Sequence, residues 1–188
     1  MKKLILASNS PRRKELLQQV QIEFEPDPSQ LEEVLDFQLS PDEMVLRLAE
    51  AKAQDVASRH KTGRILAADT MVIFKEHRLG KPQNRQDAAS MLRLLSGQKH
   101  QVMTAVVLMD LDTHRRKEAV ETTTVTMGHI SEDDLEWYLN SGESFGKAGA
   151  YAIQGLAARF IQSVEGCYYN VIGLPLFRVI QMMKELDE

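Results

Sequence analysis

The fold of the first part of the chain is decided by the stretch Leu4-Ile5-Leu6-Ala7-Ser8-Asn9-Ser10-Pro11-Arg12-Arg13-Lys14. Its first four residues are apolar and predict a short buried strand. Ser10 and Pro11 then mark the start of a helix that is expected to run to about Val20, because serine is a common N-cap and proline fits the first helical position. Hydroxyls, three cations and the unpaired amides of a helix start therefore meet at one strand end. This combination suits a phosphate, although a capped helix with a solvated basic first turn explains it equally well.

The rest of the chain alternates between helix and strand patterns. Helices are predicted at 41–59, 84–97, 131–142 and from 174 onward. Strands are predicted at 64–69, 71–75, 101–109 and 118–127, with two shorter ones near Tyr151 and Phe160. The last helix is expected to face the core with Leu176, Phe177, Ile180 and Met183. Because no linker or repeat divides the sequence, we expect an α/β fold with a mixed sheet, in a single domain of residues 1–188 that can have two lobes.

Composition excludes several classes of protein. The 188 residues carry 23 Lys and Arg against 27 Asp and Glu, a net charge of −4, which argues against a broadly basic nucleic-acid-binding surface. A small anion at a local basic cluster remains open. The single Cys167 cannot form an internal disulfide, which fits a reducing compartment. No apolar run approaches the roughly 18 residues of a membrane span and no export segment is recognised, so we expect a cytoplasmic protein without a membrane partner.

A carboxylate is expected at the carboxyl end of a second strand. Asp69 follows the apolar run 65–68 and precedes Thr70. Open α/β sheets bind ligands at that end of their strands, which makes Asp69 a candidate metal ligand or general base. A turn aspartate that ends the strand is the alternative. Glu32 could supply a second carboxylate, although adjacent glutamates in a polar stretch are more typical of a surface.

Two lysines and a glycine-spaced segment leave alternatives open. Lys52 shares a helix face with the apolar residues Val45 and Ala49, so it either extends its ammonium to solvent or reaches a buried anion, and spacing alone favours the first. Lys81 precedes a proline, which favours an extended backbone but indicates no function by itself. The segment 145–155 lacks the spacing of a phosphate-binding P-loop, so a hairpin is favoured over close approach to a ligand.

Six blocks of sequence, taken together, resemble the Maf family. They are LILASNSPRRKELL at 4–17, ADT at 68–70, GKP at 80–82, LSG at 95–97, KAGAYAIQG at 147–155 and GLP at 173–175. One block alone would be weak. All six lie in family order across nearly the whole chain, which makes the resemblance specific.

The resemblance implies an enzyme and a fold. Maf-like proteins are expected to cleave nucleoside triphosphates between the α- and β-phosphates, releasing the monophosphate and pyrophosphate with the help of a divalent metal such as Mg²⁺ or Mn²⁺. Such an activity would prevent incorporation of non-standard nucleotides. The implied fold is similar to that of inosine triphosphate pyrophosphatases, a long bent mixed sheet with a cleft between two lobes. A homodimer is a further family expectation.

The resemblance also assigns roles to the charged residues. Asp69 matches the family's proposed catalytic base, and Glu32 joins it as an implied metal ligand. Two more charged cleft positions are matched by Lys52 and Lys81. Ser8 and Arg13 match the phosphate-binding loop, which adds to the reading of that loop from its residue types.

Three positions separate branches of the family, and one position departs from its pattern. This chain has Arg12, Thr70 and Gln154, as in the dTTP and UTP branch, whereas a methylguanosine triphosphate branch has Trp, Gln and Glu there. Gln154 could pair with the O4 and N3–H edge of uracil or thymine, because its amide offers both a donor and an acceptor. Gly146 stands where the family usually has Asp, so activity could be reduced if that carboxylate assists the metal or water.

Two other functions remain as alternatives. One is a nucleotide-binding regulator of cell division or septum formation with little turnover, which would use the same cleft. The other is a nucleic-acid-binding domain built on Arg12, Arg13 and Lys14, which the net charge disfavours.

Overall fold

The computed structural model describes residues 2–31 and 36–188. The chain forms two compact units that interleave along the sequence. Unit 1 comprises residues 1–69, 104–121 and 173–188, and unit 2 comprises residues 70–103 and 122–172. Three long strands pass from one unit into the other, so each unit is built from several separate stretches of chain.

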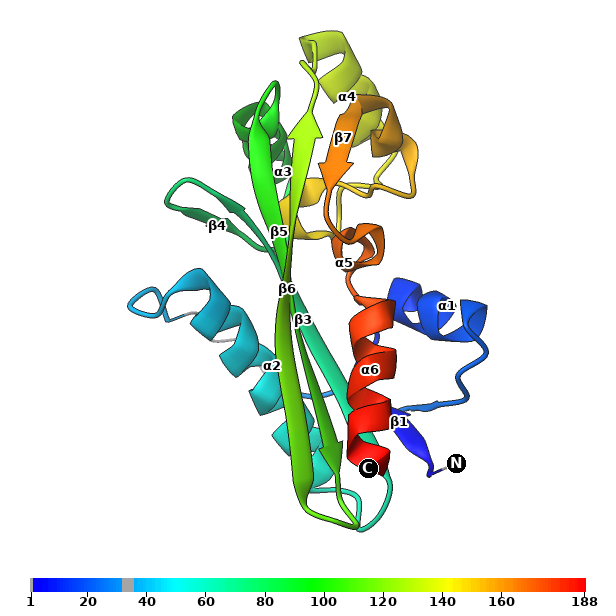
Figure 1. Cartoon of the computed structure of the whole chain (residues 1–188). Helices are drawn as coiled ribbons and strands as arrows, with labels where there is room; N and C mark the ends of the chain where they lie inside the picture. Colours follow the sequence, from blue (N-terminus) through cyan, green and yellow to red (C-terminus); the bar gives the residue numbers. More distant parts are fainter. Residues whose placement is uncertain (1, 32–35) are drawn as a thin grey trace. The chain divides into compact units, whose positions relative to one another are not determined.

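Within the described residues the strands form one seven-stranded sheet (Figure 1). They are β1 (Leu4–Leu6), β2 (Glu25–Pro26), β3 (Arg64–Phe74), β4 (His77–Leu79), β5 (Lys99–Asp110), β6 (Arg115–Met127) and β7 (Ile161–Glu165). Their order is β2-β1-β3-β5-β6-β7, with β4 paired to β3. β1 runs parallel to β2 and β3, whereas β4 and β7 run antiparallel to their neighbours. The predicted mixed α/β sheet is thereby confirmed.

The helices of the described chain begin within two residues of a predicted start, except the one at Tyr168–Ile172, which was not predicted. They are α1 (Pro11–Gln19), α2 (Pro41–Ala57), α3 (Arg85–Leu95), α4 (Glu132–Asn140), α5 (Tyr168–Ile172) and α6 (Leu176–Asp187), with two 3-10 turns, η1 (Ala148–Ala150) and η2 (Leu156–Phe160). Asn84 and Ser131 each accept a hydrogen bond from an amide in the first turn of their helix. Such caps satisfy donors that would otherwise be left without a partner.

In unit 1, helices cover both faces of the strands. Successive side chains on a strand point to opposite faces. Arg116 on β6 pairs with Glu50 on α2 at 2.8 Å, while the next residue, Lys117, pairs with Glu185 on α6 at 2.9 Å. The two helices therefore lie on opposite faces of β6, as Figure 1 also shows. β1 can be apolar along its whole length because each of its residues is buried.

A buried ion pair joins β3 and β5 within unit 1. Arg64 donates from Nε to Asp110 at 3.0 Å, and Lys2 donates to the same carboxylate at 2.8 Å. Burial alone would raise the pKa of Asp110, but the hydrogen bonds from Lys2 and Arg64 outweigh it and hold this pKa well below its usual range. The pair matters because either side chain, buried alone, would carry an uncompensated charge.

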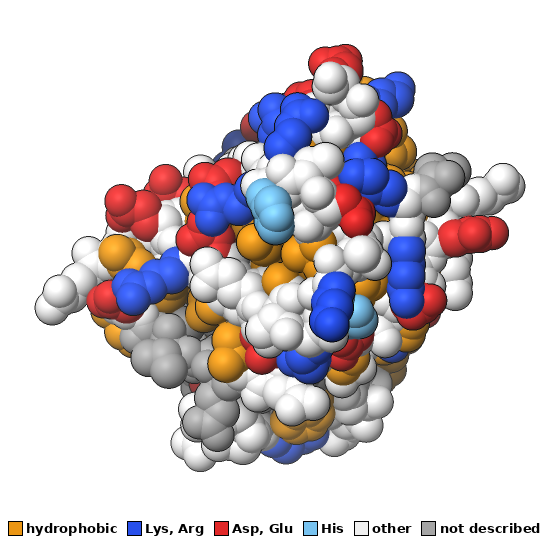
Figure 2. Space-filling view, turned by 90° about the horizontal axis from the view of Figure 1, so that it is seen from below, with side chains coloured by type: hydrophobic (Ala, Val, Ile, Leu, Met, Phe, Trp, Pro, Cys, Tyr) orange, Lys and Arg blue, Asp and Glu red, His pale blue; other side chains and the backbone are white. Residues whose placement is uncertain are grey.

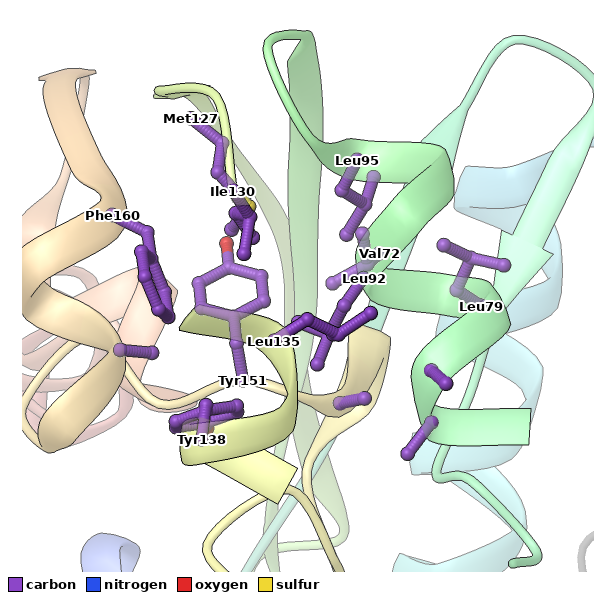
Figure 3. Packing of buried hydrophobic residues seen from close by; sticks show 14 of the residues in the cluster. Val72, Leu79, Leu92, Leu95, Met127, Ile130, Leu135, Tyr138, Tyr151 and Phe160 are labelled. Atoms are coloured by element: carbon purple, nitrogen blue, oxygen red, sulfur yellow. The ribbon is translucent and has the colours of Figure 1, made fainter. Parts of the chain in front are cut away.

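Unit 2 has its own hydrophobic core, drawn in part in Figure 3. It packs α3 and α4 against the strands and takes in residues of η1 and η2. Its members include Val72, Leu79, Leu92, Leu95, Met127, Ile130, Leu135, Tyr138, Tyr151 and Phe160. Sequence patterns give no firm prediction of structure around residues 148 and 157. Core packing fixes the backbone of both segments.

Two predictions about elements are wrong. The strands expected at 64–69 and 71–75 are one strand, β3, so Asp69 lies inside a strand and does not end it. Neighbouring residues on both sides are apolar and buried, which keeps the backbone extended through the polar pair Asp69-Thr70. No strand is found around Tyr151 within the described chain, where the 3-10 turn η1 ends just before this residue. The strand predicted near Phe160 is confirmed as β7, which begins at Ile161.

The buried face of α6 is also shifted from the prediction. Leu176, Val179, Met182 and Leu186 are buried, whereas Phe177 is 72% exposed. Apolar residues cover a wide arc of this helix, so periodicity alone does not identify which edge of the arc meets the core.

His100 on β5 is a buried titratable side chain of unit 2. It is 3% exposed, and its Nε2 lies 2.7 Å from the hydroxyl of Tyr151, with the two rings edge to face. Burial lowers the pKa of His100 from 6.5 to about 4. The native protein therefore keeps this imidazole neutral at pH values where an unfolded chain would protonate it.

We expect this histidine to make stability depend on pH. Between pH 6.5 and about 4 only the unfolded state binds the proton, so the free energy of unfolding falls as the pH is lowered through this window, by about 3 kcal/mol in all. Urea unfolding at a series of pH values measures the effect. His100→Gln should remove this part of the slope, whereas His129→Gln, at an exposed site, should leave it. Equal slopes in wild type and His100→Gln would contradict the prediction.

Candidate functional site

The predicted phosphate-binding loop is tied down by Arg13. Its Nε donates to the carbonyl oxygen of Gly173 at 2.8 Å, and its Nη1 donates to Oγ of Ser8 at 3.2 Å. Ser8 and Arg13 are only 8% and 9% exposed. The backbone amide of Ser10 also donates to the Ser8 hydroxyl at 3.2 Å. The structure thus brings Ser8 and Arg13 together, and the Ser8 hydroxyl oxygen accepts two hydrogen bonds.

Ser10 is the N-cap of α1, although its side chain makes no capping hydrogen bond. Arg12, in the first turn, is half-buried. The acceptor that the sequence did not reveal is the Gly173 carbonyl, which lies 160 residues away from Arg13 along the chain.

A second contact in unit 1 joins Lys52 to Asp69. The ammonium of Lys52, on α2, donates to Oδ1 of Asp69, on β3. Their side chains are only 14% and 8% exposed. The spacing of α2 favoured a lysine that extends to solvent, and the structure corrects this: the side chain meets a carboxylate that is almost fully buried.

The described residues that could hold a divalent metal are few. Glu32 lies outside the described residues, and among those described no group of three or more His, Cys, Asp or Glu side chains could form a metal site. Of the two predicted metal ligands, Asp69 is the one that lies within the described residues, and it offers carboxylate oxygens. This donor set fits an ion that takes most of its ligands from substrate phosphates and water, as Mg²⁺ in nucleotide sites does.

In unit 2, the segment after α4 lies against the loop that carries Lys81. The amide of Gly149 donates to the carbonyl oxygen of Gly80 at 3.0 Å. Gly149 has φ +67, and a Cβ there would lie 3.0 Å from Cγ2 of Val72. The close approach of this segment to β3 thus depends on glycine. Lys81 itself is exposed.

The predicted specificity residues have different surroundings. Thr70 is half-buried in β3, whereas Gln154 is exposed. Gly155, next to Gln154, lies against the carboxylate of Glu143. Sequence patterns did not single out Glu143 or the His100–Tyr151 pair, because neither belongs to a spacing that indicates a site. Gly146, where the family usually has Asp, has φ +71 and open space around a Cβ position.

A groove of about 750 Å³ lies in unit 2. It is lined by parts of β3, β5 and β6, with Lys75 and Lys99 among its side chains and none of the predicted site residues. On the face drawn in Figure 2, basic and acidic side chains are interspersed. Of the helices in the part of the chain that the structure describes, none is long and apolar enough to cross a membrane.

The comparison with protein families decides the assignment. The model described as "Maf-like protein" matches residues 3–186. The chain belongs to the Maf family. The resemblance read from the six sequence blocks is therefore confirmed over almost the full length.

Similar curated proteins cover the same length. One from Ruminiclostridium cellulolyticum is 43% identical over 100% of this chain and 98% of its own, and one from Halalkalibacterium halodurans is 48% identical over 98% and 96%. Both are named dTTP/UTP pyrophosphatase. Among solved structures, the Staphylococcus aureus Ham1 protein matches with a TM-score of 0.46 and 15% identity, covering 67% of this chain and 72% of that one. This last similarity is too distant to bear on function.

We expect the Lys52–Asp69 pair to be strongly coupled in stability. Lys52→Met leaves the Asp69 carboxylate buried without its ammonium, which should lower the free energy of unfolding by about 3 kcal/mol. Adding Asp69→Asn should recover part of that loss, because the double variant buries no lone charge. Chemical denaturation of the four proteins of this double-mutant cycle measures the coupling.

A matched control lies on the same helix. Arg47 pairs with Asp36 at 3.2 Å, with side chains 66% and 42% exposed. Arg47→Met should cost less than about 1 kcal/mol, as surface ion pairs do. A Lys52→Met variant no less stable than Arg47→Met would show that Asp69 does not depend on Lys52.

Proposed function

We propose that this protein hydrolyses dTTP and UTP to the nucleoside monophosphate and pyrophosphate. The observation that carries the proposal is the similarity, over nearly the whole of both chains, to relatives named for this activity. The proposal extends to modified pyrimidine triphosphates, so the activity would also keep non-standard nucleotides out of nucleic acid. The cytoplasmic location and the homodimer implied by the family resemblance stay predictions.

In the proposed mechanism Asp69 orients the attacking water and accepts its proton. Its carboxylate is held in place by Lys52 and by its position inside a buried strand. A base must be held within hydrogen-bond reach of the proton that it takes, and Asp69 meets the requirement for a fixed position. Lys52 then has two roles. It holds Asp69, and it also brings positive charge to the site where the phosphates would lie.

Positive charge on the triphosphate side would come from three residues. Arg13 is fixed by Ser8 and Gly173, while Lys52 and Lys81 contribute ammonium groups. Phosphoryl transfer depends largely on positioning and on electrostatic stabilisation of charge that develops on the leaving group. These three cations would stabilise the departing pyrophosphate in this way.

Asp69 and Glu32 are the residues proposed to hold a divalent cation. When bound, Mg²⁺ or Mn²⁺ would neutralise phosphate charge and make the α-phosphorus more open to attack by water. Base recognition is assigned to Gln154, whose amide offers a donor and an acceptor for the O4 and N3–H edge of a pyrimidine, with Arg12 and Thr70 as the other branch-specific positions.

The substrate class can be tested with a panel of nucleotides. We expect release of pyrophosphate, and no orthophosphate, from dTTP and UTP in the presence of Mg²⁺ or Mn²⁺. CTP, ATP and 7-methyl-GTP should react more slowly. Separate assays of pyrophosphate and orthophosphate decide the position of cleavage. No pyrophosphate from any nucleotide would refute the enzyme function, and a preference for 7-methyl-GTP would refute the pyrimidine assignment.

The role of Asp69 can be tested by a single substitution. Asp69→Asn keeps an acceptor for Lys52 but removes the base, so kcat for dTTP should fall by about 10²-fold or more while the protein stays folded. Asp27→Asn is the matched control, since Asp27 is another carboxylate of unit 1, paired with Arg59 and in contact with His60. Its kcat should equal that of wild type. Full activity of Asp69→Asn would remove Asp69 from the mechanism.

A further inference from the structure

Glu143 makes several hydrogen bonds to the segment that carries Gln154. Its Oε2 accepts from the amide of Leu156 at 2.9 Å, and its Oε1 accepts from the amide of Ala157 at 3.3 Å. These two amides begin η2, where an α-helix or 3-10 helix leaves its first donors without internal partners. One carboxylate therefore caps this turn, and its negative charge suits the positive end of the turn's peptide dipoles.

The fit between Glu143 and this segment depends on Gly155. A Cβ added at Gly155 would lie 2.1 Å from Oε2 and 2.4 Å from Cδ of Glu143. Real Cβ atoms do not approach other atoms so closely, so the carboxylate occupies the space that any other residue type would need. Gly155 also donates to the carbonyl oxygen of Ala152 at 3.0 Å, closing a turn around Gln154.

Both ends of this arrangement are fixed in the core of unit 2. The hydroxyl of Tyr138 donates to Oε1 of Glu143 at 3.1 Å, and the Tyr138 ring, 0% exposed, packs edge to face on Phe160. On the other side of Gln154, Tyr151 is held by His100 and lies in the same core (Figure 3). Gln154 is thus an exposed side chain on a short turn that is anchored before and after it.

We infer that Glu143 is a positioning residue for Gln154. Its carboxylate fixes the turn 152–157 so that the Gln154 amide presents its donor and acceptor in one orientation. Hydrogen-bond selection between bases requires such order, because a shift of about 1 Å in a positioning group can cost roughly a hundredfold in rate. The inference rests on the proposed function, in which Gln154 reads the pyrimidine edge.

UTP and CTP are the substrates that test this inference, because they differ at the O4 and N3 edge. Glu143→Ala should reduce the ratio of kcat/KM for UTP to that for CTP by roughly tenfold to a hundredfold, mainly through a higher KM for UTP. Gln154→Ala should reduce the ratio as much, and the double variant no further. Glu143→Gln, which keeps one acceptor oxygen, should restore part of the ratio.

Two further variants control for general effects. Glu136→Gln changes an exposed carboxylate of α4 that pairs with Arg85, and it should leave the ratio unchanged. Tyr138→Phe removes only the hydroxyl that donates to Glu143, so it gives a milder version of the same loss if Glu143→Ala does not fold. Folding is checked by circular dichroism and thermal unfolding.

Amide hydrogen exchange gives a readout that does not depend on activity. The Leu156 and Ala157 amides should exchange faster in Glu143→Ala, or in Tyr138→Phe, than in wild type. A folded Glu143→Ala that keeps the wild-type ratio while Gln154→Ala loses it would overturn the inference alone. A wild type that releases no pyrophosphate would overturn the proposed function, and unchanged exchange at both amides would then overturn the positioning role of Glu143 as well.

Discussion

The arrangement of unit 1 depends on Asp69, because a carboxylate inside a strand that is buried along its length requires a compensating charge. Removal of an ion from water is costly unless a partner replaces the lost hydration. Lys52 is that partner, and it can reach Asp69 only if α2 lies on the face of β3 to which the carboxylate points. The ion pair between Glu50 on α2 and Arg116 on β6 places the helix on the same face of the neighbouring strands. Structure and proposed chemistry thus share one requirement, a fixed carboxylate beside a cation.

Unit 2 meets a different requirement, because two of its proposed substrate-binding residues, Lys81 and Gln154, lie on loops and not on regular elements. A loop is ordered only where other interactions fix its backbone. In unit 2, core side chains and buried hydrogen bonds fix it. Tyr151 and Ala157 belong to the hydrophobic core, while Gly149 and Gly155 allow the backbone to approach a neighbouring element closely. Gly149 and Gly155 are explained by these approaches, whereas Gly146 has open space around its Cβ position. Neither the hairpin favoured from sequence nor a phosphate-binding P-loop is found in the segment 145–155.

Short sequence patterns predicted correctly those helix starts that depend on interactions between residues close in sequence. Asn84 and Ser131 were predicted as helix starts and are caps in the structure, because a side chain that accepts from its own first turn needs no distant partner. The sequence misplaced features that depend on neighbours in space. A strand break was predicted at Thr70, since a polar pair usually ends an apolar run, but burial on both sides carries β3 through it. Phe177 was assigned to the core for its apolar character, yet Val179 and Met182 face inward.

The sequence by itself determined the fold class, the family and the identity of the candidate residues, since these follow from periodicity, caps and six ordered blocks of sequence. Only the tertiary structure decided which of these residues meet. Arg13 finds its acceptor at Gly173 and Lys52 finds Asp69 on another element. Glu143, which no spacing marked, lies against Gly155. The physical reason is that a buried charge or donor must be satisfied by whichever group the packing brings within hydrogen-bond distance, and a linear pattern does not contain that group's identity.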